Sequence, residues 1–349
     1  MIEWSKPDFT EEEFSAAMAS LEVYVGANGP EVKKLEQEFA SRVGSKHAIA
    51  VCNGTAALLV SLMCVKKTHG QTKIGVPSFT FIASANSCAH IYGKENTVLL
   101  DCNRKTWNLD RVPSDIGALM AVDVGGLSCD YNYLRKLNIP IIADSAESLG
   151  STCHGELVGS QADFHCFSLH RSKIVSCGEG GMITTNSDEY NDLARSFLNH
   201  GYSKDKKPYE YKHDNYGLNY RMSDVNAAIA RVQLRKLDKY VKHRNFIADI
   251  YKQELNGLVE FQQFDSFNFL NNYFFFGVLC ENRDAVLQHL LNNEIKVKTW
   301  SAVHQQPIWS DINLTNSEMI SNKIILLPIH NTISEAEVTQ VIKTIKQVI

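Results

Sequence analysis

Short apolar runs alternate with segments of helix length between residues 47 and 198. The runs are rich in β-branched residues and carry almost no charge, so each suits a strand that is covered on both faces. This alternation predicts an α/β fold with a mostly parallel sheet. The expected strands lie at 47–52, 73–76, 96–100, 118–122, 139–143 and 181–185, and the expected helices at 55–66, 81–92, 129–137 and 187–198.

The pattern changes beyond Met222. A helical pattern continues from there to about Leu255 and is followed by further apolar runs and helix-length segments. Strands are expected at 272–280, 295–300 and 323–327, and helices at 283–292 and from Ser334. Because a single hydrophobic core rarely serves a chain of 349 residues, we expect two domains. These are a large domain over residues 1–235 and a small C-terminal α+β domain over residues 236–349.

Charge and composition argue against several classes of protein. The formal net charge is −4 and both signs are mixed along the chain, which argues against a nucleic acid as the main partner. No segment approaches the roughly 18 uninterrupted apolar residues of a membrane span, and the acidic sequence MIEWSKPDFTEEEF does not resemble a signal peptide. We therefore expect a cytoplasmic protein without membrane contact. The cysteines and histidines form no CxxC or HExxH motif, so we expect neither disulfides nor a metal site.

The segment HCFSLHRSKIVSCGEGGMITTN, residues 165–186, contains the first candidate for chemistry. Its Lys173 could form an imine with a carbonyl cofactor, a step that needs an unprotonated amine near neutral pH. Burial and the positive charge of Arg171 would favour that form. The local sequence alone, however, favours a simpler interpretation, which is a surface lysine in a loop.

Two other segments offer groups that match such a cofactor. In IPIIADSAESLGS, Asp144 follows an apolar run, and open α/β sheets gather ligand-binding groups at the carboxyl ends of their strands. A carboxylate there suits a protonated pyridine nitrogen, although Asp144 could equally be the N-cap of a helix. In VCNGTAALLVSL, backbone N–H groups at a helix start and the hydroxyl of Thr55 can bind a phosphate. A plain tight turn would explain that pattern as well.

Several motifs, taken in their order along the chain, resemble one known family. They are YVGANGPEVKKLE, NGTAAL, PSFTFIASAN, DSAESLGS, SLHRSK followed by GEGG, YGLNYRMSDVNAAI and LLPIHNTISEAEV. Together they span nearly the whole chain and resemble the DegT/DnrJ/StrS sugar-nucleotide aminotransferases. These are fold-type-I enzymes that depend on pyridoxal 5'-phosphate (PLP), so the resemblance implies that fold and that cofactor.

The resemblance also implies roles for individual residues. Lys173 matches the lysine that forms the Schiff base with PLP, and Asp144 matches the partner of the cofactor's ring nitrogen. The positions that match the family's phosphate-binding groups are Ser168 and the turn residues Gly54, Thr55 and Ala56.

Further matches concern the cofactor ring and the subunit interface. Glu147 lies where many members contact the ring hydroxyl with glutamine or histidine, which leaves its protonation open. Phe81 matches an aromatic residue that stacks on the cofactor ring, and without the resemblance core packing would be favoured for it. Asn219 matches an asparagine that reaches the phosphate of the neighbouring subunit, which implies a homodimer with shared active sites. His170 matches a frequent histidine of the family, although a hydrogen-bonded loop residue would explain it as well. His304 and Arg221 are weaker candidates and stay outside the catalytic set.

The implied reaction is a transamination in which L-glutamate donates the amino group to a nucleotide-linked keto sugar. The sequence CGEGG, the helix entry NYRMS and the N-terminal YVGANGP look like members that aminate carbon 4 of 4-keto-6-deoxy sugars, such as perosamine synthase. Members that act at carbon 3 more often carry GDGG. We therefore expect carbon-4 amination that serves polysaccharide or lipopolysaccharide O-antigen synthesis.

Three alternatives stay open beside this expectation. The first is an aminotransferase acting at carbon 3 of a sugar, and the second is one acting on a cyclitol or an aromatic precursor. The third is a non-catalytic regulatory protein that retains the fold. A dehydratase of the family usually carries histidine in place of the lysine, so the presence of Lys173 argues against that activity. The nucleotide, whether dTDP, GDP or UDP, also stays open.

Overall fold

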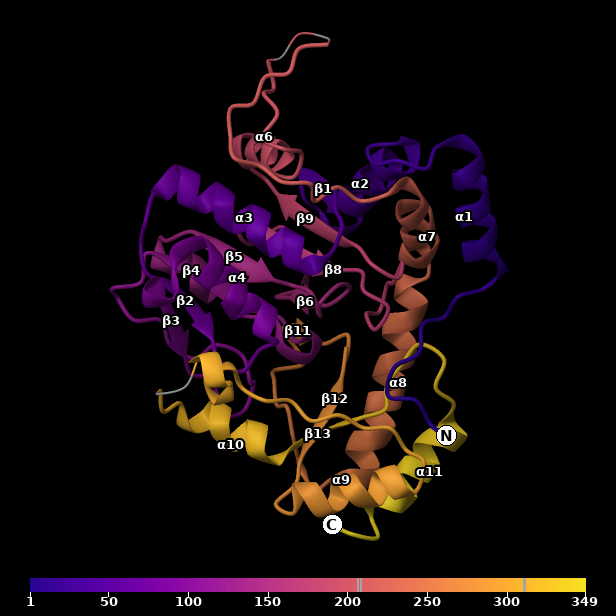
Figure 1. Ribbon diagram of the computed structural model, residues 1–349. Coiled ribbons are helices and arrows are strands. Elements are labelled where there is room, and N and C mark those ends of the chain that lie inside the picture. Colours follow the sequence, from indigo (N-terminus) through magenta and orange to yellow (C-terminus); the bar gives the residue numbers. More distant parts are fainter. Residues whose placement is uncertain (206, 208, 310–311) are drawn as a thin grey trace.

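The computed structural model describes residues 1–205, 207, 209–309 and 312–349, and its centre is a seven-stranded sheet (Figure 1). The strand order is β1-β9-β8-β5-β4-β2-β3. Strands β8, β5, β4, β2 and β3 run parallel, whereas β9 is antiparallel to both of its neighbours. The predicted α/β fold with a mostly parallel sheet is confirmed. The strands are β1 His47–Val51, β2 Ile74–Pro77, β3 Thr97–Leu100, β4 Ala118–Val122, β5 Ile141–Asp144, β8 Phe164–Ser168 and β9 Gly181–Thr185.

Side chains of the sheet alternate between two cores, because successive residues of a strand point to opposite faces. In β4, Met120 and Val122 belong to one hydrophobic cluster, and Leu119 and Ala121 belong to another. Helices α3 and α4 cover the first face, while α2 and α7 cover the other face near β1 (Figure 1). The helices of this part are α1 Glu11–Val23, α2 Pro30–Val43, α3 Gly54–His69, α4 Ile82–Tyr92, α5 Tyr131–Leu134, α6 Asp188–Phe197 and α7 Asp224–Arg235.

The sequence analysis does not predict β8, although this strand lies inside the sheet. Its run FHCFS contains a histidine and ends in a serine, so it lacks the uninterrupted apolar character of the other strands. His165 is nevertheless fully buried, and its ring bonds to the hydroxyl of Ser145 at 2.9 Å and accepts the backbone N–H groups of Gln161 and Ala162 at 3.1 Å. These partners come from other segments, and they offset the cost of burying the imidazole.

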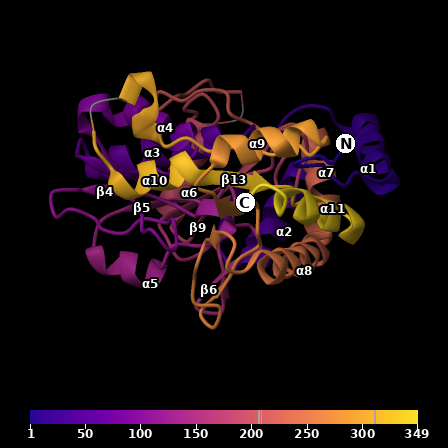
Figure 2. The same ribbon diagram turned by 90° about the horizontal axis from the view of Figure 1, so that it is seen from below.

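The C-terminal part builds a second core around an antiparallel sheet in the order β10-β12-β13. In the view from below, α8, α9 and α11 lie around β13 (Figure 2). A third, short sheet joins β11 to β6 and β7. The elements are α8 Leu237–Leu255, β10 Glu260–Phe261, β11 Phe269–Leu270, β12 Phe276–Leu279, α9 Arg283–Asn292, α10 Thr315–Lys323, β13 Ile324–Leu327 and α11 Glu335–Ile345, with β6 Thr152–Cys153 and β7 Glu156–Leu157 from the first part.

Two predictions for this part need correction. The strand expected at 295–300 is not formed; Ile295 and Lys298 make isolated bridges to Ile2 and Leu326 instead. The single helix expected over 222–255 is two helices, because the chain between α7 and α8 bends at Lys236. We keep the division into domains 1–235 and 236–349 as a proposal, which the bend at Lys236 and the separate second core support. No helix of the described residues combines the length and the apolar character that crossing a membrane would require.

A buried arginine connects α8 to both cores. The guanidinium of Arg244 is 1% exposed and donates hydrogen bonds to the backbone carbonyls of Tyr273, Phe274 and Ile329 and to the side-chain oxygen of Asn331. The amide nitrogen of Asn331 in turn donates to the carbonyl of Ile174, the residue after Lys173. Arg244 therefore connects α8 to the segments that precede β12 and follow β13 and, through Asn331, to the loop that contains Lys173.

Replacing Arg244 with methionine should destabilise the protein strongly. Arg244→Met keeps most of the volume but leaves several buried carbonyls without a donor, so the free energy of unfolding should fall by about 3 kcal/mol or more. Chemical denaturation followed by circular dichroism measures this loss. The matched control is Arg235→Met, which changes an exposed arginine at the end of α7 and should stay within about 0.5 kcal/mol of wild type. A similar small effect in both variants would contradict the role of Arg244.

Candidate active site

A cavity of about 400 Å³ lies at the carboxyl ends of β4, β5 and β8 and at the start of α3. Open α/β sheets bind ligands at this edge. Of the residues expected in the site, the lining includes Gly54, Thr55, Phe81, Asp144, Glu147, Ser168 and Lys173. Segments far apart in the sequence thus bring together most of the predicted set.

One end of the cavity is the turn at the start of α3. Asn53 is the N-cap of this helix, and its side-chain oxygen accepts the backbone N–H of Ala56 at 2.8 Å. Ala56 is buried and does not line the cavity, and its role in binding a phosphate stays a prediction. The N–H groups of Gly54 and Thr55 belong to the first helical turn, which has no intrahelical acceptor for them. A Cβ on Gly54 would lie 2.9 Å from the Cβ of Ser168, so this approach of the turn to β8 requires glycine.

Asp144 is the last residue of β5, and its carboxyl group is buried at the cavity wall. Its Oδ2 accepts a hydrogen bond from Ser84 Oγ at 2.6 Å, and its Oδ1 accepts the backbone N–H of Ala146 at 3.2 Å. Burial raises the pKa of Asp144, while the bonds from Ser84 and Ala146 and the charge of Lys173 lower it. Turns rather than a helix follow Asp144, so the alternative of a helix N-cap is wrong.

Lys173 and Glu147 face each other inside the cavity. The side chain of Lys173 is 16% exposed, its Nζ lies 3.5 Å from Glu147 Oε1, and it lies 4.0 Å from the ring centroid of Phe274. The other carboxylate oxygen of Glu147 accepts the backbone N–H of Gly125 at 2.9 Å. Burial raises the pKa of Glu147, and the negative charge of Asp144 raises it further. The charge of Lys173 and the hydrogen bond from Gly125 act in the opposite direction. The interpretation of Lys173 as a surface lysine is therefore wrong.

Phe81 and Asn219 take different positions relative to the cavity. Phe81 lines it, is 63% exposed and contacts the ring of Trp300 at a centroid distance of 6.3 Å, so its interpretation as a core residue is wrong. Asn219 is exposed and outside the lining of this cavity. Of the remaining candidates, His170 lines the cavity, whereas His304 bonds to Ser78 outside it.

One wall of the cavity was not expected from the sequence, and it is formed by Trp4, Phe274 and Lys298. The ring of Trp4 meets that of Phe274 edge to face at 6.1 Å, and the ammonium of Lys298 lies 4.1 Å from the ring centroid of Trp4. The pairing of Ile2 with Ile295 brings these segments together. The residues come from three distant parts of the chain and carry no common local pattern, so no sequence signal marks them.

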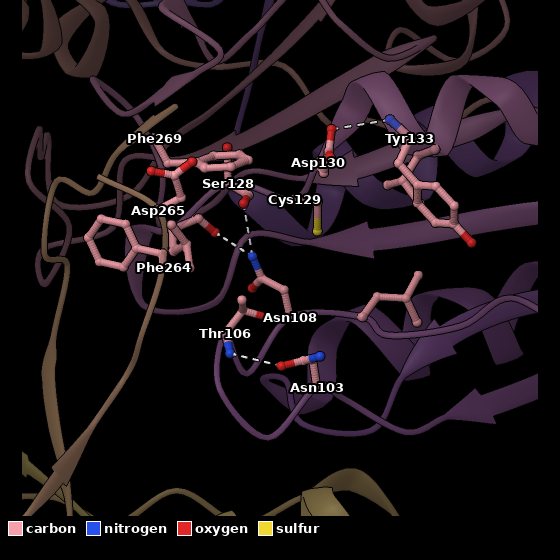
Figure 3. Close-up of a pocket in the computed structure, with 13 residues that line it drawn as sticks. Asn103, Thr106, Asn108, Ser128, Cys129, Asp130, Tyr133, Phe264, Asp265 and Phe269 are labelled. Carbon is pink, nitrogen blue, oxygen red and sulfur yellow. Dashed lines mark hydrogen bonds between the residues drawn. The ribbon is translucent and has the colours of Figure 1, made fainter. Parts of the chain in front are cut away.

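A second cavity, of about 320 Å³, lies between the loop before β4 and the segment that precedes β11 (Figure 3). The amide of Asn108 donates to the carbonyls of Leu127 and Ser128, and Asn103 accepts the backbone N–H of Thr106. Asp130, at its rim, pairs with His154 at 3.1 Å. These polar groups connect the loops around the cavity to one another, which gives them a structural role.

The chain is similar to proteins of known family over nearly its whole length. The profile of the DegT/DnrJ/EryC1/StrS aminotransferase family matches residues 7–346. GDP-perosamine synthase of Escherichia coli O157:H7 is 30% identical over 302 residues, which cover 82% of this chain and 81% of that protein. GDP-perosamine synthase of Caulobacter vibrioides is 31% identical over 347 residues, which cover 93% and 92%.

The fold has close relatives among solved structures. A Streptococcus pneumoniae protein solved in its PMP form superposes with a TM-score of 0.93 at 24% identity, covering 100% of this chain and 99% of that one. At this identity the likeness concerns the fold, which is the fold expected from the sequence.

Proposed function

This chain belongs to the DegT/DnrJ/EryC1/StrS aminotransferase family, and we propose that it transfers the amino group of L-glutamate to carbon 4 of a nucleotide-linked 4-keto-6-deoxy sugar. Its cofactor is PLP. The observation that carries the proposal is that one cavity is lined by Lys173, by the buried carboxyl group of Asp144 and by the turn at the start of α3. The similarity to GDP-perosamine synthases supports the sugar and the carbon-4 position. A cytoplasmic location and a role in polysaccharide or O-antigen synthesis stay part of this proposal.

The residues of the cavity fit PLP. Free N–H groups at the start of α3 and the hydroxyl of Ser168 would hold the phosphate, and Asp144 would pair with the ring nitrogen. Phe81 would contact the ring and Glu147 its hydroxyl. When bound, PLP supplies an electron sink for the carbon that loses its proton. The bond from Ser84 helps Asp144 to stay ionised, which keeps the ring nitrogen protonated.

Lys173 would be both the attachment point of the cofactor and the group that moves protons. Once the amino donor displaces it, the Nζ of Lys173 can take a proton from the donor's α-carbon. The walls of Phe274 and Trp4 shield this nitrogen from water. Retention of Lys173 and Asp144 in one cavity argues against a non-catalytic protein.

The attachment of the cofactor can be tested directly. Borohydride reduction of the cofactor-loaded protein should fix the cofactor to Lys173, as peptide mapping by mass spectrometry can show. Lys173→Ala should fold normally and lose turnover. Lys298 is the matched control, because it is the other lysine in the cavity lining: Lys298→Ala should still be labelled at Lys173. Label on Lys298 in the wild-type protein would overturn the assignment.

The position of amination can be tested with paired substrates. The enzyme receives glutamate and, in parallel, 4-keto-6-deoxy and 3-keto-6-deoxy sugars linked to dTDP, GDP or UDP. We expect product only from the 4-keto series, with the amine at carbon 4 by NMR, because a misplaced hydroxyl would leave buried polar groups unpaired. An amine found only at carbon 3 would contradict the carbon-4 proposal and leave the aminotransferase assignment standing. A cyclitol and an aromatic ketone in the same panel test the second alternative.

A homodimer with shared sites is also part of the proposal. Apolar side chains are exposed along α1 and among the described residues of the segment between α6 and α7. They are Phe14, Met18 and Leu21 of α1 and Tyr209, Tyr211, Tyr216 and Leu218 of the segment. Exposed apolar groups on this scale are typical of an interface. Asn219 lies in the same segment, so a second copy bound there could receive it in its cavity.

Mixed dimers can test the shared site. Lys173→Ala and Asn219→Ala should each be defective, and after subunit exchange the mixture should regain roughly a quarter of wild-type activity, since half of the dimers would then hold one intact site. The control mixture pairs Lys173→Ala with Asp144→Asn, whose changes affect the same subunit's part of the site. That mixture should recover nothing. No recovery in the first mixture, despite exchange measured by mass spectrometry, would contradict the shared site.

A further inference from the structure

Glu147 is the carboxyl group that contacts the amine of Lys173. Their charged atoms lie 3.5 Å apart, and both side chains are largely buried, at 9% and 16% exposure. The second oxygen of Glu147 is held by the backbone N–H of Gly125. Gly125 has a φ of 68°, and a Cβ there would lie 2.9 Å from the ring of Phe275, so glycine is required for this placement. One oxygen of Glu147 is thus fixed and the other faces Lys173.

The other charged groups around Lys173 are placed differently. Asp144 accepts bonds from Ser84 and Ala146, and Glu179 lies at the cavity wall 3.8 Å from the ring of His170. Lys298 and Arg171 are positively charged, and His170 can become so. Burial lowers the pKa of Lys298, and the charges of Lys173 and Arg171 lower it further. Among the described residues, Glu147 is the carboxylate that is both in contact with Lys173 and buried with it.

We propose that Glu147 accepts the proton that Lys173 must lose before it can bond the cofactor. An N–H bond of the Lys173 ammonium breaks and an O–H bond forms at Glu147 Oε1, which leaves a neutral amine with a free electron pair and a neutral carboxylic acid. No other reactant is needed, and the proton stays in the cavity. This inference rests on the proposed attachment of the cofactor to Lys173.

The environment favours this exchange. Two charged groups lose their hydration when they are buried. Burial therefore stabilises the neutral amine and carboxylic acid relative to the ion pair. Burial also raises the pKa of Glu147, which makes its carboxylate a better proton acceptor than an exposed one. At 3.5 Å the two atoms are at the outer limit of a hydrogen bond, and a small rotation of the lysine terminus closes the gap. Glutamine, which many members of the family carry here, could not accept the proton.

Cofactor capture measures this step without turnover. The holoenzyme is stripped of PLP and reloaded, and the rate of capture is followed by absorbance between about pH 5 and 10 for wild type, Glu147→Gln and Glu179→Gln. Near neutral pH, Glu147→Gln should capture PLP at least about tenfold more slowly than wild type, because its lysine must lose the proton to solvent. The difference should shrink as the pH rises. Wild-type capture should instead slow as the pH falls through the raised pKa of Glu147, where the acceptor is already protonated.

Controls separate this inference from a folding defect. Glu179→Gln removes a carboxylate of the same cavity that does not contact Lys173, and it should follow the wild-type profile. Glu147→His restores a proton acceptor and should regain most of the capture rate near neutral pH. In weakly buffered solution, Glu147→Gln should release about one proton more per PLP bound than wild type. Equal capture profiles and equal proton release in wild type and Glu147→Gln would overturn the inference.

Infrared difference spectra test the wild-type protein directly. PLP capture should produce the C=O band of a protonated carboxylic acid in wild type and in Glu179→Gln, and this band should be absent in Glu147→Gln. Absence of the band from wild type would overturn the inference even if Glu147→Gln fails to fold. Borohydride labelling of the same samples distinguishes the two levels of proposal. Label away from Lys173 defeats the proposed function, whereas label on Lys173 without the band defeats only the role of Glu147.

Discussion

The parallel pairing of β4, β5 and β8 is the constraint on which the active site depends. Val122 pairs with Asp144 and Asp144 with Cys166, so three strands end at the same edge of the sheet. The chain segments that leave this edge carry the groups of the cavity. A slip of β5 by one residue would turn Asp144 to the opposite face, away from Ser84 and from the cavity. The hydrogen bonds of the whole sheet therefore position a few reactive side chains.

The C-terminal part and the N-terminal segment complete the cavity. Arg244 and Asn331 connect α8 to the backbone next to Lys173, and the bridge of Ile2 to Ile295 brings Trp4 to the same place. Together with Phe274, these contacts take the reacting groups out of water. Their burial is the main reason that the pKa values of Asp144 and Glu147 are raised. Packing far from the sheet edge thus controls the charge of the groups at that edge.

The two buried carboxyl groups have different partners, which suits them to different tasks. Asp144 accepts hydrogen bonds from Ser84 and Ala146, which favour its charged form and oppose the effect of its burial. Glu147 shares its environment with the one group whose proton must leave. Enzymes commonly give two neighbouring carboxyl groups different environments, so that one acts as an acid and the other as a base.

The sequence by itself determined the α/β class and, through the order of its motifs, the family and the cofactor. It also pointed to Asp144 and Gly54 through a strand end and a helix start, and to Lys173 and Ser168 through the resemblance of their motif to the family's. The interior strand β8 left none, since the partners of His165 lie in other segments. Only the tertiary structure decided that Ala56 is capped by Asn53, that Trp4 and Lys298 form a wall, and that Glu147 meets Lys173. The periodicity of apolar residues indicates which face of a helix or strand is buried. These contacts depend instead on how distant segments pack against one another, and a local sequence pattern does not determine that packing.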